Sequence, residues 1–99
     1  MTHQEVVAYI QNYGTPLNSA KIVNNNTIRY TVGNTDKWLR ISYILNAHQT
    51  YKGMTVQPIN LDNIQGMRTT GCHRRFALNL MVGMGYATRN GNDYTIIQG

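Results

Sequence analysis

Residues 69–97 read TTGCHRRFALNLMVGMGYATRNGNDYTII, and this stretch decides the fold. Its apolar residues recur at helical spacing, at Phe76, Leu78, Leu80, Met81 and Met84. Such spacing predicts an amphipathic helix with broad apolar coverage. Thr69 or Thr70 is suited to cap its start through a side-chain hydroxyl, and Gly83 and Gly85 favour its end. We therefore predict a helix from about Thr70 to about Gly85.

A tight hairpin is predicted to follow this helix directly. Residues 86–89 and 93–97 are rich in β-branched and aromatic side chains, and they lie on either side of Asn90-Gly91. Both turn residues tolerate a positive φ, as a type I′ turn requires. A hairpin of this kind also ends many α+β domains of other types, and that reading stays open here.

The bulk properties indicate one domain without a membrane segment. A chain of 99 residues is long enough to bury a core and too short for two complete domains. It has no apolar run of membrane-spanning length and no basic and apolar blocks of a signal peptide. A single cysteine, Cys72, agrees with a reducing compartment. We expect a cytoplasmic protein with no membrane partner.

The charge balance favours an acidic partner. Nine Lys and Arg residues against four Asp and Glu residues give a formal net charge of +5. The basic residues are scattered, and only Arg68, Arg74 and Arg75 cluster in the sequence. Such a balance is typical of nucleic-acid-binding proteins. A basic surface without a partner is the alternative.

Two helices and a strand are predicted in the first third of the chain. Residues 3–13 place Val6, Ile10 and Tyr13 on one helical face. Residues 17–23 are predicted as a short second helix, with Asn18 or Ser19 as its cap, which the asparagine run 24–26 ends. Residues 27–32 alternate in character and are rich in β-branched residues, so we predict a strand closed by Gly33-Asn34.

The middle of the chain is predicted to contain a central helix, a short strand and a brief helix. Asp36 is suited to cap the central helix, which Trp38, Ile41 and Leu45 would line. Residues 54–56 are predicted as the short strand. Pro58 then marks a turn, and Asn60 caps a brief helix at residues 61–67, with its apolar side chains inward: Leu61 and Ile64.

From Asp36 onward the predicted order is helix, short strand, short helix, longer helix and hairpin. This order resembles the winged helix-turn-helix superfamily, as does the passage from Leu78-Asn-Leu-Met81 to Met84-Gly85-Tyr86. The resemblance spans residues 36–97. The expected fold is thus α+β: a winged-helix-like core at residues 34–99 with a C-terminal hairpin wing, preceded by an N-terminal extension at residues 1–33. We expect the N-terminal helix to pack on the core or to mediate a homodimer.

The resemblance implies a DNA-binding regulator of transcription or replication that uses no cofactor. In the superfamily the helix before the wing enters the major groove, and the wing reaches phosphates or the minor groove. Arginine suits guanine and phosphate, asparagine suits adenine, and threonine hydroxyls suit phosphate. A solvated surface position is the alternative for each candidate. The candidates for contact with double-stranded DNA are Thr69, Thr70, His73, Arg74, Arg75, Asn79, Arg89, Asn90 and Asn92.

A second functional hypothesis is a protein-interaction module that binds a host protein and inhibits or redirects it. Beyond its first turn the helix after Thr70 is apolar nearly all round, and such a helix is normally buried or covered by a partner. DNA contact would then be restricted to that first turn and the hairpin tip. Small basic single-domain proteins of this kind are frequent among phage and mobile-element products.

Catalytic chemistry is not indicated. The carboxylates are widely separated in the sequence and show no paired acid–base spacing: Glu5, Asp36, Asp62 and Asp93. Cys72 and His73 are adjacent, which is not a metal-ligand spacing, and Cys72 fits a small buried residue better. Gly83-Met84-Gly85 follows a helix, whereas a phosphate-binding loop precedes one. We therefore expect neither an enzyme nor a metal site, and we interpret the tyrosines as core and hairpin residues.

Overall fold

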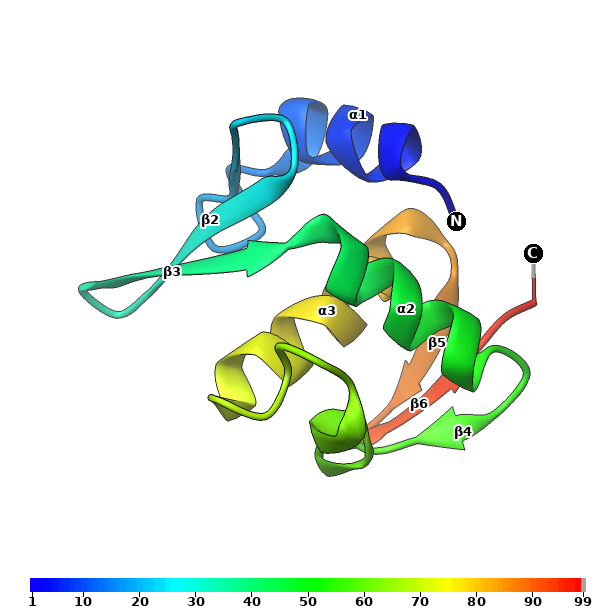
Figure 1. Ribbon diagram of the computed structural model, residues 1–99. Helices are drawn as coiled ribbons and strands as arrows, with labels where there is room; N and C mark the ends of the chain where they lie inside the picture. The colour runs from blue at the N-terminus through cyan, green and yellow to red at the C-terminus, as the bar shows by residue number, and fades with distance from the viewer. Residues whose placement is uncertain (99) are drawn as a thin grey trace.

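The computed structural model describes residues 1–98 and has an α+β fold with two three-stranded antiparallel sheets (Figure 1). No helix in this range is long and apolar enough to span a bilayer. The elements, in chain order, are α1 (His3–Tyr13), β1 (Lys21–Val23), β2 (Thr27–Val32), β3 (Thr35–Arg40), α2 (Ile41–Tyr51), β4 (Thr55–Val56), the 3₁₀ helix η1 (Pro58–Asn63), α3 (Gly71–Met84), β5 (Ala87–Asn90) and β6 (Asp93–Ile96).

Helix α1 forms where the sequence predicts it and packs on the core. Thr2 caps it reciprocally: its hydroxyl accepts the Glu5 N–H at 3.1 Å, and the Glu5 carboxylate accepts the Thr2 N–H at 3.0 Å. Val6 and Ile10 are buried, whereas Tyr13 is 57% exposed, so the apolar face is shorter than predicted. The Tyr86 hydroxyl also donates to Glu5 at 2.6 Å, which ties α1 to the chain that follows α3.

The predicted helix at residues 17–23 is wrong. Asn18 and Ser19 have φ values of 56° and 52°, which no right-handed helix contains, and Lys21–Val23 forms strand β1. The asparagine run is the turn of a hairpin, because Val23 pairs with Thr27. Asparagine tolerates the left-handed backbone that two of these turn residues adopt. The polar run therefore reverses the chain rather than ending a helix.

Strand β2 has the predicted bounds, but the helix predicted from Asp36 is wrong over its first five residues. Residues 35–40 pair with β2 along its whole length, and α2 begins only at Ile41. Gly33, with a φ of 61°, and Asn34 form the two-residue turn between these strands. Only the position of Trp38 suggested that the helix starts before Ile41. The strand hydrogen bonds of residues 35–40 outweigh that helical spacing. The boundary expected between residues 33 and 34 falls within this turn.

The short elements of the middle segment lie close to their predicted positions. Strand β4 confirms the strand at residues 54–56. The brief helix is a 3₁₀ helix that begins at Pro58 and ends at Asn63, so the predicted range 61–67 is displaced, and Gln57 rather than Asn60 is its cap. The Gln57 N–H donates to the side-chain oxygen of Asn60 at 2.7 Å, so Asn60 stabilises this cap from inside the helix. Leu61 and Ile64 are buried, as predicted.

The helix and hairpin of residues 70–97 are confirmed. The Thr70 hydroxyl accepts the Cys72 N–H at 3.1 Å, and Gly85 ends α3 in the left-handed conformation. The hairpin turn lies one residue later than predicted, since Asn90 pairs with Asp93. Of the two residues in this turn, Gly91 and Asn92, only Gly91 has a positive φ, of 63°. This pattern belongs to a type II′ turn rather than to type I′.

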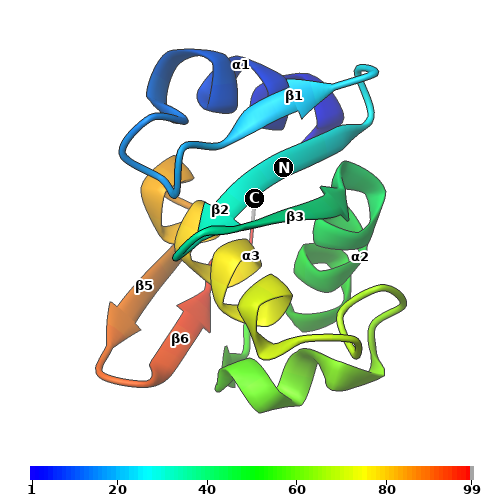
Figure 2. The same cartoon turned by 90° about the vertical axis from the view of Figure 1, so that its left-hand side faces the viewer.

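Two sheets flank α3 and position it. In the C-terminal sheet β6 lies between β4 and β5, so the hairpin is anchored to the segment before α3. In the N-terminal sheet β2 is central, and its Tyr30 ring stacks on Phe76 of α3, with centroids 4.1 Å apart. Figure 2 shows α3 between β3 and the β5–β6 hairpin.

Candidate nucleic-acid interface

Helix α3 leaves a narrow polar strip uncovered. Its apolar side chains are buried in the domain's own core: Phe76, Ala77, Leu78, Leu80 and Met81. Arg75 is exposed, and Cys72 and Asn79 are half-buried, at positions that share one helical face. A ligand that binds this face of α3 would therefore contact Arg75 and Asn79.

The β5–β6 hairpin is joined to this strip through Asn79. The side-chain oxygen of Asn79 accepts the Tyr94 hydroxyl at 2.8 Å and Nη1 of Arg89 at 3.3 Å. Arg89 lies opposite Tyr94 in the strand pairing, and its guanidinium is 5.1 Å from the Tyr94 ring centroid. Its Nε donates to the Gly91 carbonyl at 2.8 Å, so the arginine is held along the hairpin.

A second contact brings Arg75 to the hairpin turn, where its Nη1 lies 3.5 Å from the side-chain oxygen of Asn92. We call Arg75, Asn79, Arg89 and Asn92 the helix–hairpin cluster. Every hydrogen bond that its two guanidinium groups make within residues 1–98 is to a neutral oxygen. Their positive charge is therefore not neutralised by a bonded carboxylate.

Asn79 has a different role from the adenine contact that the sequence suggested. A bidentate contact with adenine requires the amide oxygen of the asparagine as an acceptor and its NH₂ group as a donor. The oxygen already accepts two hydrogen bonds from within the domain, and both of its lone pairs are thereby engaged. Asn79 consequently positions the hairpin against α3.

A groove of about 210 Å³ borders the cluster on the side of β2. Sequence reasoning predicted only two of its seven lining residues, Arg75 and Asn79, because local patterns do not show that β2 packs beside α3. Tyr94 was missed as well, although its alternation in β6 predicts an inward side chain. The groove is lined by Asn18, Tyr30, Val32, Cys72, Arg75, Phe76 and Asn79.

His73 and Arg74 do not join the cluster. His73 is buried, and its Nδ1 lies 2.6 Å from the Tyr30 hydroxyl. Burial lowers the pKa of His73, and nearby Lys37 lowers it further, so its ring is neutral at pH 7. Arg74 is half-buried and donates from Nη1 to the Met67 carbonyl at 3.0 Å. Both residues therefore bond groups of the domain itself near the start of α3.

The remaining predicted residues lie at the two ends of the candidate interface. Thr69 is exposed in the turn before α3, and Thr70 is half-buried as the helix cap. Asn90 is exposed at the end of β5, beside the turn that carries Asn92. The tertiary structure thus brings Arg75, Asn79, Arg89 and Asn92 into contact, with the threonines at the helix start and Asn90 at the hairpin end.

Because His48 and His73 are buried, we predict that the free energy of unfolding decreases in acid. Burial lowers the pKa of both His48 and His73 below the ordinary value of 6.5. The unfolded chain therefore binds protons first, and the free energy of unfolding falls as the pH drops through about 6.5 toward the lower folded-state values. Urea denaturation from pH 8 to pH 5 measures this fall. His73→Gln should reduce its steepness, and a stability that rises on acidification would contradict the assignment.

No protein-family model, curated protein sequence or solved structure matches this chain.

Proposed function

We propose that this protein is a small intracellular regulator of winged-helix type that binds double-stranded DNA through the helix–hairpin cluster. In this proposal Arg75 on α3 contacts the major groove, and Arg89 and Asn92 on the β5–β6 hairpin contact the adjacent phosphates. The observation that carries it is the convergence of two arginines from separate elements on one exposed face, without a bonded carboxylate.

The order of elements supports the winged-helix part of the proposal. From α2 onward the chain runs helix, strand, 3₁₀ helix, helix and hairpin, as the resemblance implies. Pairing of β6 with both β4 and β5 fixes the hairpin relative to α3. A helix and a hairpin held in this way can contact a groove and its flanking backbone together, without an ordering cost at the moment of binding.

The dimensions of α3 also suit a major groove. Its 14 residues span about 21 Å at 1.5 Å per residue, and the major groove of B-DNA, about 12 Å wide, admits an α-helix. Arg75 lies in the second turn of α3, so a guanidinium at this position reaches base edges when the N-terminal half of the helix enters the groove. Thr69 and Thr70, at the start of the same helix, lie where phosphates would flank it.

The apolar character of α3, one of the features behind the protein-interaction alternative, has an explanation within the domain. The apolar residues of α3 belong to the buried core of the domain, together with residues of both sheets and of other helices. The nearly all-round apolar character of this helix is therefore explained by its central position, and it does not call for an external partner. We accordingly favour DNA.

Binding of random-sequence duplex DNA across a series of salt concentrations tests the proposal. We expect binding at low ionic strength, with log affinity falling linearly with log salt concentration by about 0.9 for each phosphate neutralised. Filter binding or fluorescence anisotropy measures it. A folded protein that does not bind duplex DNA even at low salt would exclude the proposed function.

A further inference from the structure

The N-terminal sheet has a second basic surface on the side away from α3. Side chains alternate between the two faces of a strand, and the strand register decides which of them meet. Ile22, Ile28 and Leu39 form one row across β1, β2 and β3, and they face the core. The neighbouring row is Lys21, Arg29 and Trp38, which therefore lies on the opposite, outer face. Two cationic side chains and one indole thus lie next to one another on the solvent-facing side of the sheet.

Trp38 is the unexpected member of this row. Tryptophan is highly buried on average, and the sequence predicted Trp38 as a core residue of a helix. Instead its side chain is 55% exposed on β3. Within the described part of the chain no aromatic ring stacks on the indole, and no cation lies over it. A large flat apolar surface is thus available to a ligand.

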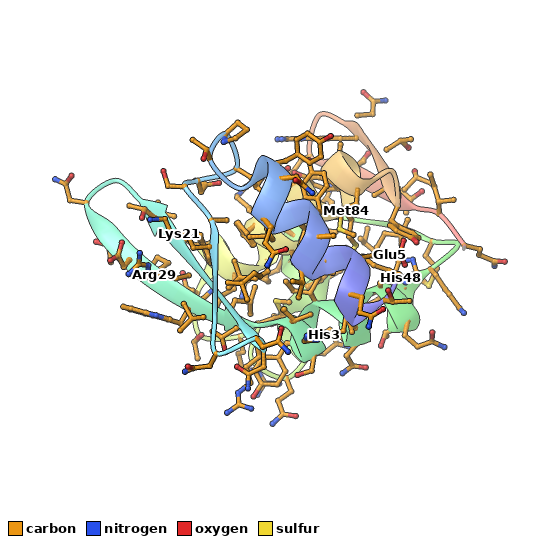
Figure 3. All side chains as sticks on the ribbon, turned by 90° about the horizontal axis from the view of Figure 1, so that it is seen from above. His3, Glu5, Lys21, Arg29, His48 and Met84 are labelled. Atoms are coloured by element: carbon orange, nitrogen blue, oxygen red, sulfur yellow. The ribbon has the colours of Figure 1, made fainter. Side chains whose placement is uncertain are left out.

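The charge around Trp38 is predominantly positive. The next row of the same face contains Arg40, opposite Thr27, so three cations share this face of the sheet with the indole. The one carboxylate on the face belongs to Asp36, and its Oδ1 accepts the Thr31 hydroxyl at 2.9 Å. Figure 3 shows Lys21 and Arg29 near one another, well away from Glu5 and His48. The charge pattern therefore complements an anionic ligand.

We propose that this outer face binds single-stranded nucleic acid. A base stacks on the indole of Trp38, and the flanking phosphates lie against Lys21, Arg29 and Arg40. An exposed aromatic ring within a basic surface is the combination that single-strand-binding proteins use, because every base has a π-face and every linkage a negative charge. A duplex buries its base faces and would leave the indole unused. An acidic peptide would use the cations alone.

This surface is separate from the helix–hairpin cluster. Arg29 and Tyr30 are consecutive in β2 and therefore point to opposite faces of the sheet. Tyr30 faces α3, where it stacks on Phe76, and Arg29 faces away. The single-strand site thus does not depend on the duplex-binding proposal, and each can fail without the other.

Fluorescence of the intact protein tests this inference directly, because Trp38 is the sole tryptophan. We expect a thymidine oligonucleotide of about ten residues, within the usual site size, to quench the indole emission in a saturable, salt-dependent way. Binding of the same oligonucleotide, carrying a dye, should weaken about tenfold or more in Trp38→Ala, the loss that one unstacked base predicts. Trp38→Phe, which keeps a stacking ring, should recover most of that loss.

Variants that remove a positive charge distinguish base stacking on Trp38 from general electrostatic attraction. Lys21→Ala with Arg29→Ala should lower the salt slope for the oligonucleotide by about 1.4, which is about 0.7 for each phosphate contact on a single strand. Lys52→Ala removes an exposed cation after α2 and serves as the control. The inference is overturned if the oligonucleotide leaves the emission unchanged. It is equally overturned if duplex DNA or polyglutamate quenches as strongly, or if Trp38→Ala binds as tightly as Lys52→Ala.

Discussion

Replacing Arg75 and Arg89 together with alanine is expected to weaken duplex DNA binding at least about 30-fold, because each arginine contact contributes roughly 1–3 kcal/mol. Both side chains belong to the helix–hairpin cluster, and neither is bonded to a carboxylate that would already neutralise it. The salt dependence should also become shallower, because fewer phosphates are neutralised. Anisotropy titrations of a labelled duplex at several salt concentrations measure both effects.

Two control variants make this result specific. Lys21→Ala with Arg29→Ala removes the same amount of charge from the outer face of the N-terminal sheet. Its effect on duplex affinity should be much smaller, since salt screens exposed charges that do not touch the ligand. Arg74→Ala should lower stability more than affinity, because Arg74 bonds the Met67 carbonyl. Equal losses of duplex affinity in the two double variants would show that net charge, and not the cluster, causes binding.

Tyr30→Ala is expected to lower the free energy of unfolding by about 3–5 kcal/mol, the usual cost of truncating a buried aromatic ring to alanine. Tyr30 is 1% exposed, stacks on Phe76 and bonds His73, so one side chain holds the N-terminal sheet against α3. Small domains are stable by only about 5–15 kcal/mol. Urea denaturation followed by far-ultraviolet circular dichroism measures the loss, since the exposed Trp38 is a poor reporter of the core.

Tyr30→Phe and Tyr13→Ala provide the comparison for this experiment. Tyr30→Phe keeps the stacked ring but leaves His73 Nδ1 without its partner, and it should cost about 1–3 kcal/mol. Tyr13 is 57% exposed at the end of α1, and its replacement by alanine should change stability by less than about 1 kcal/mol. If Tyr30→Ala were as mild as Tyr13→Ala, β2 would not be packed on α3 as described.

Local sequence patterns predict the structure correctly where neighbouring residues favour the same element. The start and end of α3 follow from a threonine cap and a C-terminal glycine, and its buried face follows from apolar spacing. The two strands of the C-terminal hairpin were predicted for the same reason. The turn was placed one residue early, because Asn90-Gly91 and Gly91-Asn92 are both acceptable turn pairs. The strand pairing decides between them.

Local signals failed where two patterns competed. Trp38, Ile41 and Leu45 have helical spacing, and this pattern masked the strand at residues 35–40. Gly33-Asn34 is itself a recognised two-residue hairpin turn, so the signal for β3 was present in the sequence. In the structure this turn joins β2 to β3. The exposed position of Trp38, from which the single-strand proposal starts, follows from this pairing.

The sequence by itself determined the residue types of the candidate interface and the elements that carry them: arginines and asparagines at the start of a helix and along a hairpin. Only the tertiary structure decided which of these residues act together. Arg74 and Arg75 are adjacent and look equivalent in the chain, yet consecutive helical positions lie about 100° apart around the axis. Arg74 therefore turns toward the Met67 carbonyl and Arg75 toward the hairpin turn, while His73 meets Tyr30, 43 positions earlier in the chain.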